Sequence, residues 1–442
     1  MKAQSPWTRA SEMAGLTPES RNRYVDFLRM LSILSVVVGH WMMAAPYLVE
    51  GKAVLGHMLD LAPWSRWMTW LMQVMPVFFF VGGFSNGTSW DAALRKKMSY
   101  SAWLDRRLRR LLGPVLPLLL VWMVLSILAR AGGAGPQTIH IASRTALVPL
   151  WFLAIYILVI LFVPISRKAW HQWGYSSIFV PVLAAGCLDY AYFAMGRHTI
   201  AWLNYLFVWT AVHQLGYAWL DGRVRGLSRS LPIGLFGLAA LVFLTRFGPY
   251  PLSLVGVPSE SVSNTLPPKL PLLALAAAQF GFLLSFEGIA RRFLARRIPW
   301  TLTVLINGLI MSIFLWHSTI MVLIIGVVFT WLPGFVVFHP GSTAWWAMRP
   351  LWILAYSVVL TPVVLLVAPF EGGGPSRERV PSLLRLLPGC FLACGGLAFL
   401  AYGGIGAELQ LVTWGPLLAV FAGTAIAGIT PLTACFRSSK GA

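Results

Sequence analysis

The chain has 442 residues, of which 58% are hydrophobic and only 11% are charged, whereas a soluble globular protein carries roughly 25% charged residues. Its 34 Lys and Arg outnumber its 14 Asp and Glu and give a net charge of +20, which suits nucleic acid or anionic lipid as a partner. The composition excludes an ordinary soluble protein, so the placement of the basic residues must decide between these partners.

The first 23 residues are polar and contain Pro6 and Pro18. The apolar run that follows is too long and begins too late for a simple cleaved signal peptide. We therefore predict that residues 1–23 are a cytoplasmic leader.

About a dozen apolar runs follow, each close to the roughly 20 residues that cross a bilayer as a helix. The sequence thus predicts an all-α polytopic membrane protein, a bundle of about twelve transmembrane helices. These spans are expected to begin near residues 27, 65, 111, 147, 177, 200, 231, 270, 303, 346, 389 and 412.

The distribution of Lys and Arg predicts the orientation. With twelve spans and a cytoplasmic N-terminus, the inner segments hold 25 of the 34 basic residues and the outer segments hold 8. Arg29 lies within the first span. Basic residues are retained on the cytoplasmic side of membranes, so the sequence predicts a multi-pass cell (plasma) membrane protein with both termini in the cytoplasm. Membrane lipids are then its surroundings, and the charge requires no nucleic-acid partner.

The first span carries three ionisable residues, Asp26, Arg29 and His40, which are costly inside a membrane and hence functional candidates. Asp26 and Arg29 can pair at i, i+3. Eleven residues separate Arg29 from His40, about 20° more than three full helical turns, so both project from one face about 16 Å apart. A neutral imidazole can take a proton from a hydroxyl, but a buried histidine bonded to its neighbours fits the same pattern.

Two further histidines lie within apolar runs. His317, about fourteen residues into the ninth span, has a depth comparable with that of His40, so the two are able to line one cavity. For His317 a packing role and a functional role both stay open, whereas packing is the better interpretation for His213 and its neighbour Gln214. Three more polar residues in apolar surroundings have no partner evident from the sequence: Asp189, Glu287 and Asn307.

The most basic stretch runs from Arg95 to Arg110 and contains Arg106, Arg107, Arg109 and Arg110. It is placed to meet a polyanion at the inner face, or it anchors two spans to anionic headgroups; residue types alone leave both open. The cysteines show no metal-ligand spacing, and Cys390 and Cys394, one helical turn apart, are expected to pack. No metal site is predicted.

In this order the features resemble the membrane-bound acyltransferase-3 family. Asp26-Phe27-Leu28-Arg29 and the Arg29-x10-His40 spacing are similar to its first span. The other similar segments are Phe78–Phe84, the basic segment Arg106–Pro114, Leu150–Leu153, Ile313–His317 and, as in actinobacterial members, the loop Ser261–Pro268. The Phe78–Phe84 run ends in glycines that on composition alone indicate tight packing or a helix break.

Two departures from the family pattern matter. Gly82 stands where the family usually has a serine, which puts a role for that hydroxyl in doubt. The family's core has ten spans, so we expect an acyltransferase-3-like membrane core over residues 24–388 and an extra C-terminal helical pair with a short cytoplasmic tail over residues 389–442.

The resemblance implies an O-acyltransferase that moves an acyl group, most commonly acetyl, from cytoplasmic acyl-CoA to a hydroxyl of an extracytoplasmic glycan or glycolipid. It implies acyl-CoA as a co-substrate and no permanently bound cofactor. His40 is expected to be the general base or a transient acyl carrier, Arg29 to position the donor, His317 to orient the acceptor, and Arg106, Arg107, Arg109 and Arg110 to hold the CoA phosphates. The alternatives are a transporter or flippase of lipid-linked sugars and, ranked last, a noncatalytic scaffold.

Overall fold

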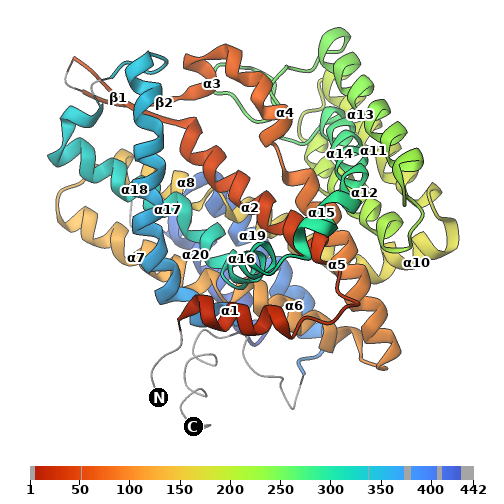
Figure 1. The fold of residues 1–442 in the computed structure, drawn as a ribbon. Coiled ribbons are helices and arrows are strands. Elements are labelled where there is room, and N and C mark those ends of the chain that lie inside the picture. The colour runs from red at the N-terminus through yellow and green to blue at the C-terminus, as the bar shows by residue number, and fades with distance from the viewer. Residues whose placement is uncertain (1–4, 51, 337, 373–379, 406–410, 430–442) are drawn as a thin grey trace.

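The computed structural model describes residues 5–50, 52–336, 338–372, 380–405 and 411–429 as a helical bundle with one small hairpin (Figure 1). The first half contains α1 (Pro6–Gly15), α2 (Arg23–Met43), β1 (Ala44–Val49), β2 (Lys52–His57), α3 (Met58–Leu61), η1 (Pro63–Met68), α4 (Thr69–Met72), α5 (Met75–Arg95), α6 (Tyr100–Leu112), α7 (Val115–Ala131), α8 (Pro136–Leu147), α9 (Leu150–Leu161), α10 (Val163–Trp173), α11 (Ser176–Ala194) and η2 (Ile200–Leu203). The second half contains α12 (Asn204–Leu220), α13 (Leu227–Phe247), α14 (Leu270–Ser285), α15 (Glu287–Leu294), α16 (Arg297–Gly308), α17 (Ile310–Trp331), η3 (Pro333–Val336), α18 (Thr343–Val367), η4 (Ala368–Gly372), α19 (Leu383–Gly403) and α20 (Leu411–Ile426).

The bundle has two distinct ends. The amphipathic helices α1 and α6 lie together at one end, which we call the basic end because α6 carries four arginines (Figure 1). The antiparallel pair β1 and β2, in which Ala44 pairs with His57, lies at the opposite end with α3; we call this the hairpin end. Helix α2 connects the basic end with the hairpin end. It begins at Arg23, after its N-cap Asn22, and its last residue, Met43, leads directly into β1.

The expected number of twelve spans is not confirmed. Within the described residues, eight helices are long and apolar enough to cross a membrane, or up to ten if each of two bent helix pairs counts as one span. The pairs are α8 with α9, bent by 41°, and α14 with α15, bent by 55°. Two of the expected spans correspond to α12 and α20, which have 17 and 16 residues, and a helix this short falls at or below the length that spans hydrocarbon.

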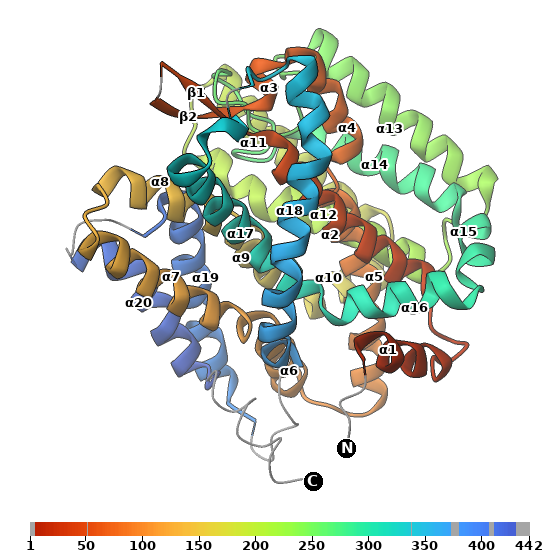
Figure 2. The ribbon, with the colours of Figure 1, turned by 60° about the vertical axis from the view of Figure 1, so that its left-hand side comes forward.

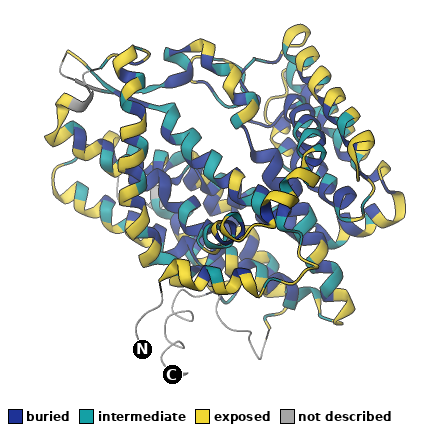
Figure 3. Ribbon diagram, in the orientation of Figure 1, coloured by how far each residue is buried: buried dark blue, intermediate teal, exposed yellow. Residues whose placement is uncertain are grey.

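The outer faces of the bundle are strongly apolar. Large side chains on its peripheral helices stand exposed, and Phe179, Phe236 and Leu366 are each more than two thirds accessible. Figure 3 shows that exposed residues gather on the outward faces of the helices and buried residues in the centre. A soluble protein rarely exposes such continuous apolar surface. The chain is therefore a membrane protein whose peripheral helices face lipid.

Close helix packing explains the glycines of the Phe78–Phe84 run. A Cβ on Gly83 would lie 1.8 Å from the backbone oxygen of His213, and one on Gly216 would lie 2.1 Å from that of Phe80. Only glycines allow α5 and α12 to approach this closely. The tight-packing interpretation of this segment is confirmed, and α5 continues through the glycines without a break.

The long connection between α13 and α14, residues 248–269, folds over the hairpin end. The amide of Asn264 donates to the carbonyls of Pro251 and Ser253, while Trp70 Nε1 and Gln73 Nε2 donate to carbonyls of the connection at 2.9 Å. Lys269 is fully buried and donates to two carbonyls of the same segment. These bonds hold the connection against α4 and the start of α5.

The last two described helices, α19 and α20, form a close pair beside α9 (Figure 2). A Cβ on Gly389 would lie 2.6 Å from the carbonyl oxygen of Gly423, so this pair too depends on small residues. Cys390 and Cys394 are buried and free in this interface. The predicted cytoplasmic tail, with Cys435, lies outside the described residues.

Candidate active site

The half of the candidate site nearer the basic end begins on α2. Asp26 accepts from Arg29 Nη1 at 3.3 Å and from Arg21 Nε at 2.6 Å, which confirms the predicted i, i+3 pair. Arg29 Nη2 donates to Ser85 Oγ of α5 at 2.5 Å, and Asn307 donates to the backbone oxygen of Asp26. These contacts aim the guanidinium of Arg29 from α2 toward α5.

The two candidate histidines of α2 and α17 meet although 277 residues separate them. His40 Nδ1 and His317 Nε2 are 2.8 Å apart, and the two rings are nearly parallel, with an interplanar angle of 17° and centroids 5.1 Å apart. His317 Nδ1 lies 2.7 Å from the carbonyl oxygen of Phe314, and Trp41 Nε1 donates to the carbonyl of His317. The structure thus brings together the pair that the sequence placed at similar depth.

These contacts determine which ring nitrogen carries the proton in each of the two neutral imidazoles. A carbonyl oxygen can only accept, so His317 Nδ1 carries its proton and His317 Nε2 is an acceptor. His40 Nδ1 then donates to His317 Nε2, which leaves His40 Nε2 as the ring nitrogen with a free lone pair. Within the described residues His40 Nε2 has no hydrogen-bond partner. An imidazole held in this way can accept a proton from a hydroxyl.

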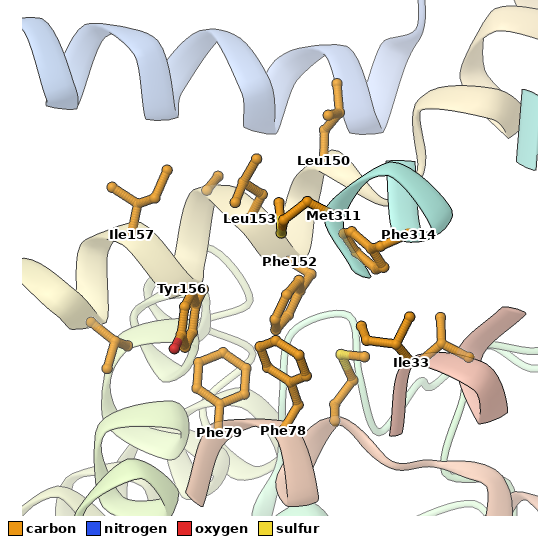
Figure 4. Close-up of a cluster of buried hydrophobic side chains, with 14 of the residues drawn as sticks. Ile33, Phe78, Phe79, Leu150, Phe152, Leu153, Tyr156, Ile157, Met311 and Phe314 are labelled. Atoms are coloured by element: carbon orange, nitrogen blue, oxygen red, sulfur yellow. The ribbon is translucent and has the colours of Figure 1, made fainter. Parts of the chain in front are cut away.

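An aromatic layer supports the histidine pair. Phe152 of α9 lies against Phe78 of α5 with ring centroids 4.7 Å apart and against Phe314 of α17 with centroids 5.3 Å apart. Tyr156 stacks on Phe152. Figure 4 shows these rings converging from three helices. Three of the segments that carry the family resemblance therefore meet in one cluster, which fixes the turn of α17 just before His317.

The four arginines of α6 do not share one role. Arg107 Nη2 donates to Ser89 Oγ, and Arg107 and Arg110 both interact as like charges with Arg29. Neither makes an ion pair within the described chain. We call Arg29, Arg107 and Arg110 the arginine cluster. In contrast, Arg109 is buried in an ion pair with Asp105 at 3.0 Å, and Arg106 is exposed on the surface of α6.

A carboxylate absent from the sequence-based predictions borders this cluster. Glu371 of η4 accepts from the backbone nitrogens of Met311 and Ser312 and from Ser312 Oγ at 2.8 to 3.3 Å. An acid at this position satisfies the open N–H groups at the start of α17. Glu371 therefore positions the helix that carries His317. The sequence carries no signal for Glu371, because it lies in a connection that also holds Glu378 and basic residues and matches no motif.

On the other side of the histidine pair lies a cavity of about 730 Å³ that extends toward the hairpin end. Its lining includes His40, Phe152 and Phe314 from the aromatic and histidine layer, and His57 from β2. Burial lowers the pKa of His57 despite the opposing effect of the Asp60 charge, and the lowered pKa favours the neutral imidazole. His57 was missed in the sequence because it lies in a short segment with no helical periodicity or motif.

The remaining polar candidates are held in structural contacts. His213 is buried, and its Nε2 lies 3.2 Å from Asn86 Nδ2, in agreement with a packing role. Asp189 accepts from Tyr250, Asn204 and the backbone of Leu270. Glu287 accepts from Trp219 and Arg291. Packing supplied the partners that the sequence did not reveal. In the described part of the chain, no group of three or more His, Cys, Asp or Glu residues is placed to hold a metal ion.

Apart from Arg21 and Glu371, the residues of these contacts lie within one family domain. Residues 22–368 match the model of the acyltransferase-3 family, described as an acyltransferase domain. This is well over half of the chain, so the protein belongs to that family and is a membrane acyltransferase. No curated protein and no solved structure matches the chain. The family match ends before α19, so the pair α19 and α20 lies outside the matched segment.

Proposed function

We propose that this membrane acyltransferase moves an acyl group, acetyl in the simplest case, from cytoplasmic acyl-CoA to a hydroxyl of an extracytoplasmic glycan or glycolipid. The observation that carries the proposal is the histidine pair, which stands between the arginine cluster on one side and the cavity on the other. The basic end then faces the cytoplasm, as the positive-inside rule requires, and the protein lies in the cell membrane with both termini inside.

The arginine cluster is suited to the donor. The three guanidiniums of the cluster repel one another, and within the described residues only Arg29 contacts a carboxylate directly, that of Asp26. A bound polyanion would stabilise such a site. CoA carries several phosphates, which cannot enter hydrocarbon cheaply. Arg29, Arg107 and Arg110 hold them at the basic end, and the flexible arm of CoA carries the thioester toward His40. Arg106 adds positive charge at the entrance, whereas Arg109 supports α6 through Asp105.

The chemical step uses the free nitrogen of His40. The acceptor hydroxyl oxygen attacks the thioester carbonyl carbon while His40 Nε2 takes the hydroxyl proton. The carbon–sulfur bond breaks, and the leaving CoA thiolate receives the proton from His40, which yields an ester and free CoA. The hydrogen bond from His40 Nδ1 to His317 Nε2 keeps Nε2 aimed at the acceptor, and His317 acts through His40 as a positioning residue.

The decisive test is transfer of labelled acetyl from acetyl-CoA to glycan and lipid fractions of membranes that contain equal amounts of the wild-type chain or its His40→Ala variant. Label that appears with the wild type and disappears with the variant supports the proposal. Equal label with the wild type and the variant would show that His40 is not required for acyl transfer. Movement of an acceptor across the membrane with no new ester would instead indicate a transporter or flippase.

A further inference from the structure

The wall of the cavity is methionine-rich. Six of the chain's 15 methionines line it: Met42, Met43, Met58, Met68, Met72 and Met75. Methionine is unbranched and polarizable, so such a wall adapts to flexible apolar ligands. The volume of about 730 Å³ lies in the range of pockets that hold small-molecule ligands.

Three polar side chains of the wall are occupied by hydrogen bonds within the chain. Ser65 Oγ donates to a backbone carbonyl, Thr69 Oγ1 both donates to one and accepts from the amide of Leu254, and Gln73 Nε2 donates to the carbonyl of Leu254. Along the methionine wall, a sugar chain would leave its hydroxyls without partners, which costs about 1–3 kcal/mol for each buried group. The interior of the cavity thus favours a ligand with few hydroxyls.

Two imidazoles of the wall each have a ring nitrogen without a hydrogen-bond partner among the described residues, and the side chains of Ser35, Arg144 and Tyr402 likewise make no hydrogen bond to a described residue. His40 presents its free Nε2, and His57 makes no hydrogen bond to any described residue through either ring nitrogen. The two histidines line the same cavity and are close enough to interact electrostatically. A hydroxyl between them would donate its proton toward His40 and meet a second polar group at His57.

We infer that the cavity is the acceptor site and that the part of the acceptor beside the reacting hydroxyl is a hydrocarbon, with His57 as a further residue that binds the hydroxyl. This inference rests on the proposed acyl transfer and narrows its acceptor from glycans in general to an amphiphilic molecule. The hydrocarbon lies along the methionine wall, and its hydroxyl reaches His40 Nε2.

The binding test uses dodecan-1-ol that carries a photoreactive diazirine at its far end, with the full-length protein in nanodiscs. We expect saturable crosslinks to the segment that holds Met72 and Met75, removed by excess dodecan-1-ol but not by maltotriose. The cavity-filling variant Met72→Trp should lose them, whereas Met195→Trp, at an exposed position on the outside of the bundle, should keep them. Crosslinks confined to lipid-facing helices, or protection by maltotriose, would overturn the inference.

The transfer test separates this site from the proposed function. Membranes with the wild type should place labelled acetyl in the organic-extractable fraction, and His57→Leu should lower this transfer about 10-fold, the scale of one lost hydrogen bond. The KM for acetyl-CoA should not change. His57→Gln, which restores a polar atom near Nε2, should recover part of the rate, and His171→Leu, on α10 and outside the cavity lining, should behave as wild type.

The two tests fail in different ways. Saturable crosslinking without any acyl transfer would leave the cavity site in place and remove the proposed reaction. Transfer that is sensitive to His40 but appears only in water-soluble glycan, with no saturable crosslink, would leave the reaction in place and remove the hydrocarbon site.

Discussion

The two sides of the histidine pair differ sharply in chemistry. Toward the basic end, the arginine cluster concentrates positive charge, and Ser85 and Ser89 supply hydroxyls that orient it. Toward the hairpin end, the cavity offers methionines, aromatic rings, two imidazoles and the guanidinium of Arg144. The proposed polyanionic donor and uncharged acceptor need such different surroundings, because each would be poorly solvated in the other's place. His40 stands where they meet.

The largest effect should come from the residue common to both sides. His40→Ala removes the proton acceptor, and we expect a loss of acyl transfer of about 10³-fold, within the range attributed to general bases. The measurement is kcat for labelled acetyl transfer in proteoliposomes, with thermal unfolding as a check on folding. His171→Ala, far from the pair in the chain and outside the cavity, is the matched control. If His40→Ala and His171→Ala have comparable activity, the histidine pair does not take part in acyl transfer.

The next effect concerns His317, which acts through His40. His317→Leu removes the acceptor for His40 Nδ1, and we expect kcat to fall about 100-fold, since a small misplacement of a catalytic group carries such costs. His317→Gln can still accept that bond and should recover part of the rate. The kcat of both variants and the pH profile of kcat distinguish a positioning role from a packing role. If Leu and Gln give the same rate and profile, the bond does not orient His40.

A change in the arginine cluster should affect only the donor side. Arg107→Gln removes one of three charges that repel one another, so we expect the KM for acetyl-CoA to rise about 10-fold while stability is kept. Arg29→Lys retains charge but loses the bidentate fork, and it should weaken donor binding as well. The KM of the acceptor should stay constant in both. Unchanged donor affinity and turnover in these variants would exclude the cluster as the CoA site.

Arg109 provides the contrast within α6. Arg109→Gln removes the ion pair between Arg109 and the buried Asp105, so we expect lower stability, by about 3 kcal/mol, with little change in the KM for acetyl-CoA. Thermal unfolding in nanodiscs measures the first quantity, and donor titration measures the second. A large rise in the KM for acetyl-CoA without loss of stability would indicate that Arg109 binds the donor.

The smallest effect on activity should come from His213, the buried histidine with no access to the cavity lining. His213→Gln preserves a polar partner for Asn86, so we expect acyl transfer within about two-fold of the wild type. His213→Leu removes one of the two hydrogen-bond partners of Asn86 Nδ2, the other being the Tyr156 hydroxyl, and should lower stability by about 1 kcal/mol. A marked loss of kcat in His213→Gln at unchanged stability would show that its packing interpretation is wrong.

The sequence predicted the helical membrane fold, the segments of the family and the first-span site because all of these depend on local patterns. Apolar runs of sufficient length require helices in lipid. The spacing from Arg29 to His40 fixes their common face through helical geometry alone, and the Asp26–Arg29 pair follows in the same way. Where local length was marginal, as in α12 and α20, the span count of twelve exceeded the eight to ten that the described helices support.

Only the tertiary structure decided which distant residues meet. The hydrogen bond between His40 and His317 joins positions 277 residues apart, and no periodicity reports a contact across two helices. Packing likewise separated Arg107 and Arg110 from Arg109, although all four arginines lie within five residues of α6. It also brought His57 from a short hairpin to the cavity wall. A helix sets the direction of a side chain relative to its own axis, but the rotation of each helix against its neighbours is set by packing.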